Sequence, residues 1–152
     1  MSPWRVVTRE HQGARQLADR HYTRRPKQRG KRGFAAPGGV LVLLAESFWG
    51  RAAWVTRRSD FDKHQWPGAW CCTLFRNEGP WLSSRLIRQA VSRTQAAWGR
   101  APHGWVTFVD PSKVKSTNPG FCFLQAGWKR IGWTPGGHGR KSLLVLGLGV
   151  AA

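Results

Sequence analysis

Three apolar segments near the middle of the chain constrain the fold more than any other feature. Val40–Glu46 and Trp49–Thr56 are joined tightly around Ser47-Phe48, and this spacing predicts an antiparallel hairpin. Ala69–Phe75 follows a polar loop over residues 57–68 and predicts a third strand of the same sheet. A three-stranded meander needs cover on its apolar faces, so helices from the rest of the chain must pack against it.

An amphipathic helix follows the meander. Glu78-Gly79-Pro80 breaks the chain, Ser83 or Ser84 can cap the helix, and Gly99 ends it. The opposite, polar face of this helix carries Arg85, Arg88, Ser92 and Arg93. Its predicted apolar stripe consists of Leu86, Ala90, Val91, Ala97 and Trp98.

Shorter segments complete the order of elements. They predict a strand at Trp4–Val7, a helix at Arg9–Tyr22, a strand at Gly104–Val109, a short helix within Pro119–Gly127, and strands at Ile131–Thr134 and Leu143–Leu146. The resulting order is strand, helix, three strands, helix, strand, short helix and two strands. It predicts one α/β domain over residues 1–152, a mixed sheet covered by helices, with a basic loop at 23–38 and a short tail at 147–152.

The charge of the chain indicates its partner. Lys and Arg number 25 against 7 Asp and Glu, which gives a formal net charge of +18. Such a surface repels itself unless an anion neutralises it, and the usual anion is a phosphate backbone. Because 41% of the residues are hydrophobic, we expect a folded protein that binds DNA or RNA.

Two basic segments are the expected phosphate contacts, because arginine suits bidentate contacts to phosphate. The loop after the first helix holds Arg20, Arg24, Arg25, Lys27, Arg29, Lys31 and Arg32 without one acid, and the polar face of the main helix adds Arg85 and Arg88.

The ten tryptophans divide into two groups. Those at turns or in loops, Trp49, Trp66 and Trp81, are placed to stack on an unstacked base. Trp66, in a polar loop of its own, is the first candidate. The others lie on apolar faces and are predicted to be core: Trp4, Trp54, Trp70, Trp98, Trp105, Trp128 and Trp133.

The three cysteines indicate a reducing compartment. Cys71 and Cys72 are adjacent, Cys122 stands alone, and no signal for secretion precedes them, so we expect a cytoplasmic protein without a disulfide framework. Neighbouring strand residues face opposite sides of a sheet, which separates Cys71 from Cys72. The apolar run from Leu143 to Ala152 is too short to span a bilayer, so no membrane partner is expected.

The candidate catalytic residues are Tyr22, Asp110 and His21. Tyr22 is the only tyrosine and precedes a run of arginines, whose positive charge favours a phenolate that acts as a base or a metal ligand. Asp110 ends an apolar strand, where sheets often present functional groups. The structural alternatives are a packed, hydrogen-bonded His-Tyr pair and a turn that begins at Asp110-Pro111.

The order of elements resembles the GNAT acyltransferase fold across nearly the whole chain. In GNAT enzymes the turn before the main helix binds the pyrophosphate of acyl-CoA through backbone N–H groups. Arg76, Gly79 and Ser83 match that turn and are the expected cofactor contacts. Trp81 stands where the family has a small residue, and Pro80 lacks an amide hydrogen, so we expect weak or absent acyl-CoA binding.

Three segments together resemble the Mom family. They are Arg20-His21-Tyr22-Thr23-Arg24, Thr107-Phe108-Val109-Asp110-Pro111 and the run from Gly120 to Trp128. Mom proteins are GNAT-like phage enzymes that convert adenine in DNA to its N6-carbamoylmethyl form, which protects it from restriction.

The resemblance to Mom proteins has consequences for the site and its location. It implies activity for His21, Tyr22 and Asp110, iron near the His-Tyr pair, and residence in a bacterial host cell that carries or is infected by a phage. A later tyrosine of the family falls at Phe123, so that role is absent or met elsewhere.

Two other functions stay open on the sequence alone. One is an acetyl-CoA-dependent GNAT transferase that acts on RNA or on an amine. The other is a basic protein without enzymatic activity that coats or bends nucleic acid. A nucleobase-modifying transferase acting on DNA is the expectation carried forward.

Overall fold

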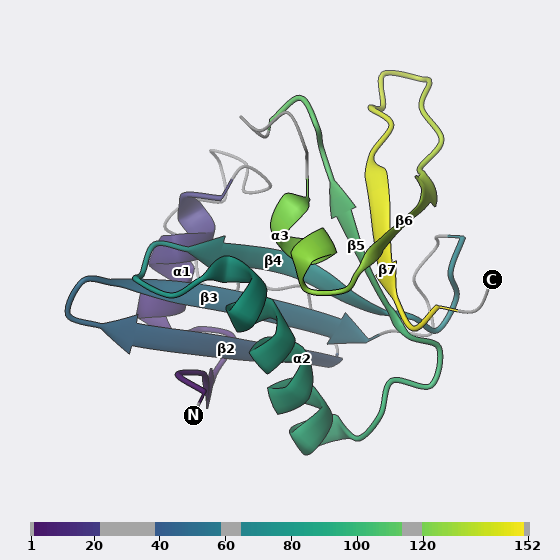
Figure 1. Ribbon diagram of the computed structural model, residues 1–152. Helices are drawn as coiled ribbons and strands as arrows, with labels where there is room; N and C mark the ends of the chain where they lie inside the picture. Colours follow the sequence, from purple (N-terminus) through teal and green to yellow (C-terminus); the bar gives the residue numbers. More distant parts are fainter. Residues whose placement is uncertain (1, 22–38, 59–64, 114–119, 151–152) are drawn as a thin grey trace.

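The computed structural model describes residues 2–21, 39–58, 65–113 and 120–150 (Figure 1). Its elements are β1 (Arg5–Val7), α1 (Gln12–Asp19), β2 (Gly39–Ser47), β3 (Gly50–Arg58), β4 (Trp70–Asn77), α2 (Ser83–Trp98), β5 (Trp105–Val109), α3 (Phe121–Gln125), β6 (Lys129–Trp133) and β7 (Leu144–Leu148). The predicted order of ten elements is confirmed.

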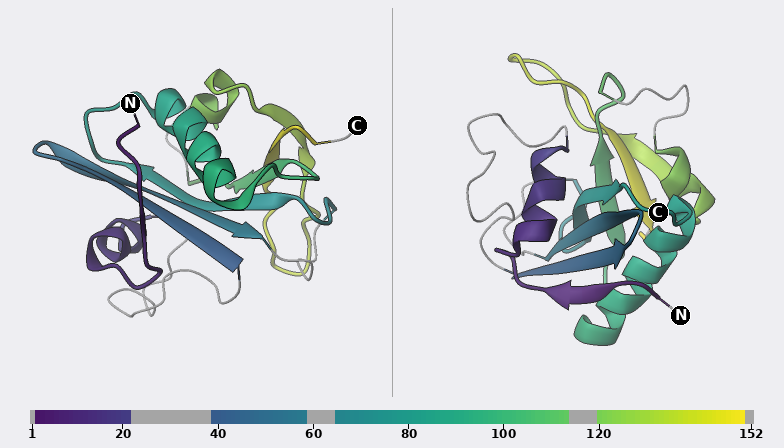
Figure 2. Two further views of the ribbon diagram at one scale, coloured as in Figure 1. Left: turned by 90° about the horizontal axis from the view of Figure 1, so that it is seen from below. Right: turned by 90° about the vertical axis from the view of Figure 1, so that its left-hand side faces the viewer.

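The strands form one seven-stranded mixed sheet in the order β1-β2-β3-β4-β5-β7-β6. Every neighbouring pair is antiparallel except β4 and β5, which run parallel because α2 connects them as a crossover. Helix α1 covers one face of the sheet, and α2 and α3 cover the other (Figure 2). The expected mixed sheet covered by helices is therefore what the chain forms.

The larger core lies between the sheet and helices α2 and α3. At its centre the fully buried Trp54 ring contacts the rings of Phe75, Trp105, Phe123 and Trp128. The Trp54 indole N–H donates to the Thr56 hydroxyl at 2.7 Å, so this buried polar group is satisfied. A second, smaller core packs α1 against the opposite face, where Leu17 meets residues of β2, β3 and β4.

The predicted hairpin is confirmed, with its turn one residue later than expected. Ser47 pairs with Gly50, so the two turn residues are Phe48 and Trp49. Gly50 has a φ of +153°, and a Cβ there would lie 2.0 Å from the carbonyl oxygen of Glu78. Only glycine fits this close approach of the hairpin to the turn that precedes α2.

Two helix boundaries differ from the sequence predictions. Helix α1 begins at Gln12 instead of residue 9, because His11 caps it by accepting a hydrogen bond from the Gly13 amide through Nδ1 at 3.1 Å. Helix α2 begins at Ser83 after Leu82, and no side chain caps it. The capping role predicted for Ser83 or Ser84 is therefore wrong; the Ser83 hydroxyl accepts from the Asn77 amide instead.

Three further predictions are corrected by burial and strand pairing. In α2, Ala97 is exposed, while Thr94 is buried and its hydroxyl donates to the carbonyl of Ala90. Trp133, predicted to be core, is 53% exposed on the edge strand β6. Strand β7 reaches Leu148, since Gly147 pairs with both neighbouring strands, so the tail is shorter than 147–152.

The other core tryptophans lie as predicted. Trp4, Trp54, Trp70, Trp105 and Trp128 are buried, and Trp98 is half-buried against the larger core.

Cys72 and Cys71 belong to the clusters on opposite faces of the sheet, which confirms their predicted separation.

Candidate functional site

A pocket forms where β4 and β5 diverge. The two strands are hydrogen-bonded only from Trp70↔Trp105 to Cys72↔Thr107. Beyond this point β4 follows β3 as far as Asn77, whereas β5 follows β7 (Figure 1). The carboxyl ends of two parallel strands therefore separate, which is the usual place for a ligand site in such a sheet.

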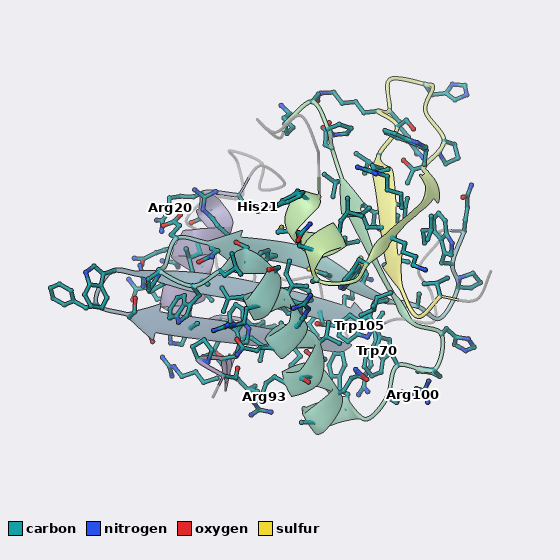
Figure 3. The ribbon with its side chains drawn as sticks, viewed as in Figure 1. Arg20, His21, Trp70, Arg93, Arg100 and Trp105 are labelled. Carbon is teal, nitrogen blue, oxygen red and sulfur yellow. The ribbon has the colours of Figure 1, made fainter. Side chains whose placement is uncertain are left out.

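This β4–β5 pocket has a volume of about 160 Å³. His21, just after α1, lines it, and Figure 3 shows this side chain beside α3. The pocket wall is mostly apolar. It consists of residues 72–75 of β4, residues 107–109 of β5, and Gly120, Cys122 and Phe123 at α3.

The two thiols of the pocket are held protonated. Burial raises the pKa of Cys72 well above its ordinary value, and burial also raises the pKa of Cys122. Because the thiolate is the nucleophilic form, neither cysteine is suited to covalent catalysis here. Thr107 also lines the pocket, and its hydroxyl donates to the Cys72 carbonyl at 2.9 Å.

His21 enters the pocket as a neutral imidazole. Its amide donates to the Ala18 carbonyl at 3.0 Å, which places the residue at the end of the α1 turn. Burial, with a further contribution from the Arg76 charge, lowers the pKa of His21 to about 4. A neutral imidazole carries one hydrogen-bond donor and one acceptor nitrogen.

The depressed pKa of His21 predicts a pH-dependent stability. Above the ordinary value of 6.5 the residue is neutral in both states; between 6.5 and about 4 the unfolded chain takes up a proton that the folded protein does not. The free energy of unfolding is therefore expected to fall by about 3 kcal/mol as pH falls through this range.

Urea unfolding of the wild type and of His21→Gln over this pH range measures the effect. The variant should lack this loss of stability. Glu78 contributes in a lower range, between 4.5 and about 2, so the two effects separate. Equal pH dependence in both proteins would contradict the buried, neutral state of His21.

A charged cluster fixes the end of α1 to the end of β4. Arg20 donates to both carboxylate oxygens of Glu78, at 2.8 and 2.7 Å, and Arg76 donates to the same carboxylate. Arg76 also donates to the carbonyl of Arg20 at 2.8 Å. Hydrogen bonds from Arg20, and then from Arg76, lower the pKa of Glu78 to about 2, so the carboxylate stays ionised.

This cluster contains two residues that were predicted to contact ligands. Arg20 was expected at nucleic-acid phosphate and Arg76 at acyl-CoA, and both engage Glu78. Arg20 directly precedes the pocket residue His21, and Arg76 donates to the Arg20 carbonyl, so both arginines hold the end of α1 next to the pocket. The two arginines and one carboxylate leave a surplus positive charge at this edge of the molecule.

The turn before α2 differs from an anion-binding cradle. The Gly79 amide donates to the side-chain oxygen of Asn77 at 3.0 Å, and the Glu78 amide donates to the Arg51 carbonyl at 2.8 Å. Pro80 has no amide hydrogen. The Trp81 ring lies against Gly79, 2.2 Å from where a Cβ would stand.

Acetyl-CoA is therefore expected to bind weakly or not at all. A pyrophosphate here would have to displace internal hydrogen bonds and approach the ionised Glu78. Isothermal titration calorimetry with acetyl-CoA measures this directly. Saturable micromolar binding would contradict the expectation and would favour an acetyl-CoA-dependent enzyme.

Asp110 lies at the end of β5, directly after the pocket residue Val109. Its Oδ1 accepts from the Ser112 amide at 2.9 Å and from the Ser112 hydroxyl at 2.6 Å. The Lys141 ammonium is 3.8 Å from Oδ2. The Ser112 hydrogen bonds, together with Lys141 and Lys113, lower the pKa of Asp110 below its ordinary value, so the group is a carboxylate.

One of the three predicted catalytic residues lines the pocket, and a second lies one residue beyond its wall. His21 lines it, and Asp110 follows a residue that lines it, although 89 positions of the numbering separate them. Tyr22 directly follows His21 in the sequence and lies outside the described residues. The Asp110 side chain also begins a turn, so the structural alternative for this residue has an observed basis.

The predicted nucleic-acid contacts are placed only in part. Arg85 and Arg88 are exposed on α2, and the Arg88 guanidinium donates to the Gln125 carbonyl at 2.6 Å. The predicted loop contacts Arg24, Arg25, Lys27, Arg29, Lys31 and Arg32 lie outside the described residues. Trp66 is half-buried and packs against a small cluster with Ile131 and Phe108, so it presents less open ring surface than a loop position suggests.

The implied iron is not supported by the described residues. Of its two predicted ligands only His21 is described, and Arg76 is close enough to oppose a cation there electrostatically. Within residues 2–21, 39–58, 65–113 and 120–150 no group of three or more His, Cys, Asp or Glu is arranged to hold a metal ion. No reaction step is assigned to iron below.

The class defined by these observations is a mixed α+β protein with an apolar pocket at the diverging ends of two parallel strands. Comparison of the chain with protein-family models, curated proteins and solved structures gives no match. Among the described helices none has the length and apolar character needed to cross a membrane.

Proposed function

We propose that the protein is a GNAT-like transferase that modifies a base of DNA, with adenine as the substrate of choice. One observation carries the proposal: the β4–β5 pocket is lined by His21 and by the end of the strand that leads to Asp110. Both residues were selected from the sequence for their resemblance to Mom proteins. The net charge of +18 supplies the attraction to a phosphate backbone.

The pocket suits one flat, weakly polar group. Its wall includes Phe75, Phe108 and Phe123, and its volume of about 160 Å³ leaves room for a small molecular fragment. A base inside a duplex is out of reach of any such pocket, so the target must be extruded or single-stranded. Aromatic and apolar walls are the surfaces that receive extruded bases.

The three candidate catalytic residues divide the proton chemistry between them. In the transfer the lone pair of the exocyclic amine forms a bond to carbon of the donor, the leaving group departs with its electron pair, and the amine loses a proton. His21, which is mostly buried and neutral at neutral pH, is assigned a hydrogen bond that orients the amine. Tyr22 and Asp110 are assigned the transfer of the proton.

Nucleoside mass spectrometry of cells that express the protein tests this function. DNA from these cells is expected to contain an adenine nucleoside of increased mass and to resist restriction digestion. Modified RNA with unmodified DNA would favour the RNA-modifying alternative. Unmodified nucleic acid of both kinds, with tight binding retained, would identify a basic protein that coats nucleic acid.

A further inference from the structure

The turn between β2 and β3 displays two aromatic side chains to solvent. Phe48 is 94% exposed and Trp49 is 78% exposed, and their rings meet edge to face with centroids 5.6 Å apart. Most other large apolar side chains of the described residues are buried or half-buried. Adjacent exposed rings on one turn typically mark a contact surface for another molecule.

The fold does not need these rings. Ser47 closes the turn: its hydroxyl donates to the Gly50 carbonyl at 2.8 Å and accepts from the amides of Trp49 and Gly50, both at 3.2 Å. The Glu78 amide donates to the Arg51 carbonyl and so anchors the hairpin next to its turn. Backbone groups and one serine therefore hold the rings on a rigid support.

The turn projects from the end of the sheet beyond the helices, as Figure 1 shows at the left and Figure 2 shows in its left-hand view. Along β3 it lies five residues from Trp54, which pairs with the pocket residue Phe75. At about 3.3 Å per residue the separation is roughly 17 Å. This corresponds to about five steps of a DNA duplex, at 3.4 Å per step.

The charges next to this turn favour an anionic partner. The two acids there, Glu46 and Glu78, already pair with Arg5 and with Arg20 and Arg76. Arg51 adds a further positive charge beside them. A second copy of the chain would bring its own +18 to this surface, whereas a phosphate backbone neutralises it.

We propose that Phe48 and Trp49 form an aromatic wedge that inserts between base pairs of duplex DNA, a few steps from the base that enters the β4–β5 pocket. Apolar side chains that enter a base step unstack it and kink the duplex, which loosens neighbouring bases. The wedge rests on the proposed action on DNA and adds to it the requirement for a duplex.

A duplex that carries 2-aminopurine tests the wedge, because this base becomes fluorescent when it is unstacked. The wild type is expected to raise the fluorescence at one or two positions of a scanned duplex. Phe48→Ser with Trp49→Ser should abolish the rise and weaken duplex binding about five- to hundred-fold, the usual range for loss of stacked rings. The salt dependence of binding should not change, because no charge is removed.

Two further variants serve as controls. Trp133→Ser removes an indole that is 53% exposed on β6, the far edge of the sheet, and should leave both signals at the wild-type level. Phe48→Tyr with Trp49→Phe keeps two rings on the turn and should retain unstacking. Circular dichroism of each variant confirms the fold, which the Ser47 hydrogen bonds are expected to preserve.

Several results would overturn the wedge. A double serine variant that unstacks DNA as strongly as the wild type would contradict it. If the double serine variant keeps its DNA binding but no longer binds phosphatidylserine vesicles, the rings contact a membrane. If it keeps its DNA binding but a dimer of the wild type dissociates in sedimentation, the rings contact a second copy of the chain. Base modification is measured separately, by nucleoside mass spectrometry. Unstacking without base modification would therefore contradict the transferase function and still support the wedge.

Discussion

Asp110→Asn is expected to lower DNA modification by about a hundred- to ten-thousand-fold, which is the usual effect of removing a positioned proton-transfer group. Asparagine keeps a side-chain oxygen that accepts from Ser112, so the turn after β5 is preserved. The substitution removes no positive charge, and DNA affinity should stay nearly unchanged. Modified nucleosides are measured by mass spectrometry and affinity by titration of a labelled duplex.

Ser112→Ala is the matched control for Asp110. It removes the hydroxyl that donates to the carboxylate at 2.6 Å but leaves the charge, which is still ionised at neutral pH. Modification should therefore persist. If Ser112→Ala and Asp110→Asn reduce modification equally, Asp110 acts by holding the turn, and the structural alternative for this residue is correct.

Tyr22→Phe belongs to the same experiment. It removes one hydroxyl from the residue that follows His21 and should abolish modification to a similar extent, again with unchanged affinity. A fully active Tyr22→Phe variant would assign the proton to another group. His21→Gln is expected to retain more activity than either, because His21 is assigned orientation of the amine.

The order of elements was predictable because it depends on local pattern. The alternation at Cys71 and Cys72 places them on opposite faces, and the tight spacing of β2 and β3 permits only a hairpin. The exact turn was less predictable, since Trp49 fits the pattern of the following strand equally well. Thr94 was missed in α2 because a threonine looks polar, although its hydroxyl is satisfied within the helix.

The site was predictable only as separate pieces. Motifs in the sequence indicated His21 and Asp110. The pocket that His21 lines, and whose wall ends one residue before Asp110, depends on β4 leaving β5 after three paired positions. The pairing of Arg20 and Arg76 with Glu78 was also hidden, because Arg20 and Glu78 are 58 residues apart. Long-range contacts of this kind follow from the assembled sheet and leave no periodic signal in the chain.

DNA binding is expected to weaken steeply with salt, by about a thousandfold or more between 50 and 200 mM if six or more phosphates are contacted. Of the described cations, Arg20 already engages Glu78, so the loop of residues 23–38 and the outer face of α2 are the main expected contributors. Each phosphate contact adds about 0.9 to the slope of log affinity against log salt.

Replacing Arg24, Arg25 and Arg29 together with alanine should therefore reduce the slope by about 2.7, three contacts at about 0.9 each, without loss of fold. The matched control replaces Lys129, Arg130 and Arg140, which are exposed on β6 and the connection after it. It removes the same charge from the far edge of the sheet and should change the slope less. Equal slopes for the two triple variants would show a diffuse electrostatic attraction instead of contacts from the loop, and a wild-type slope near zero would refute nucleic-acid binding itself.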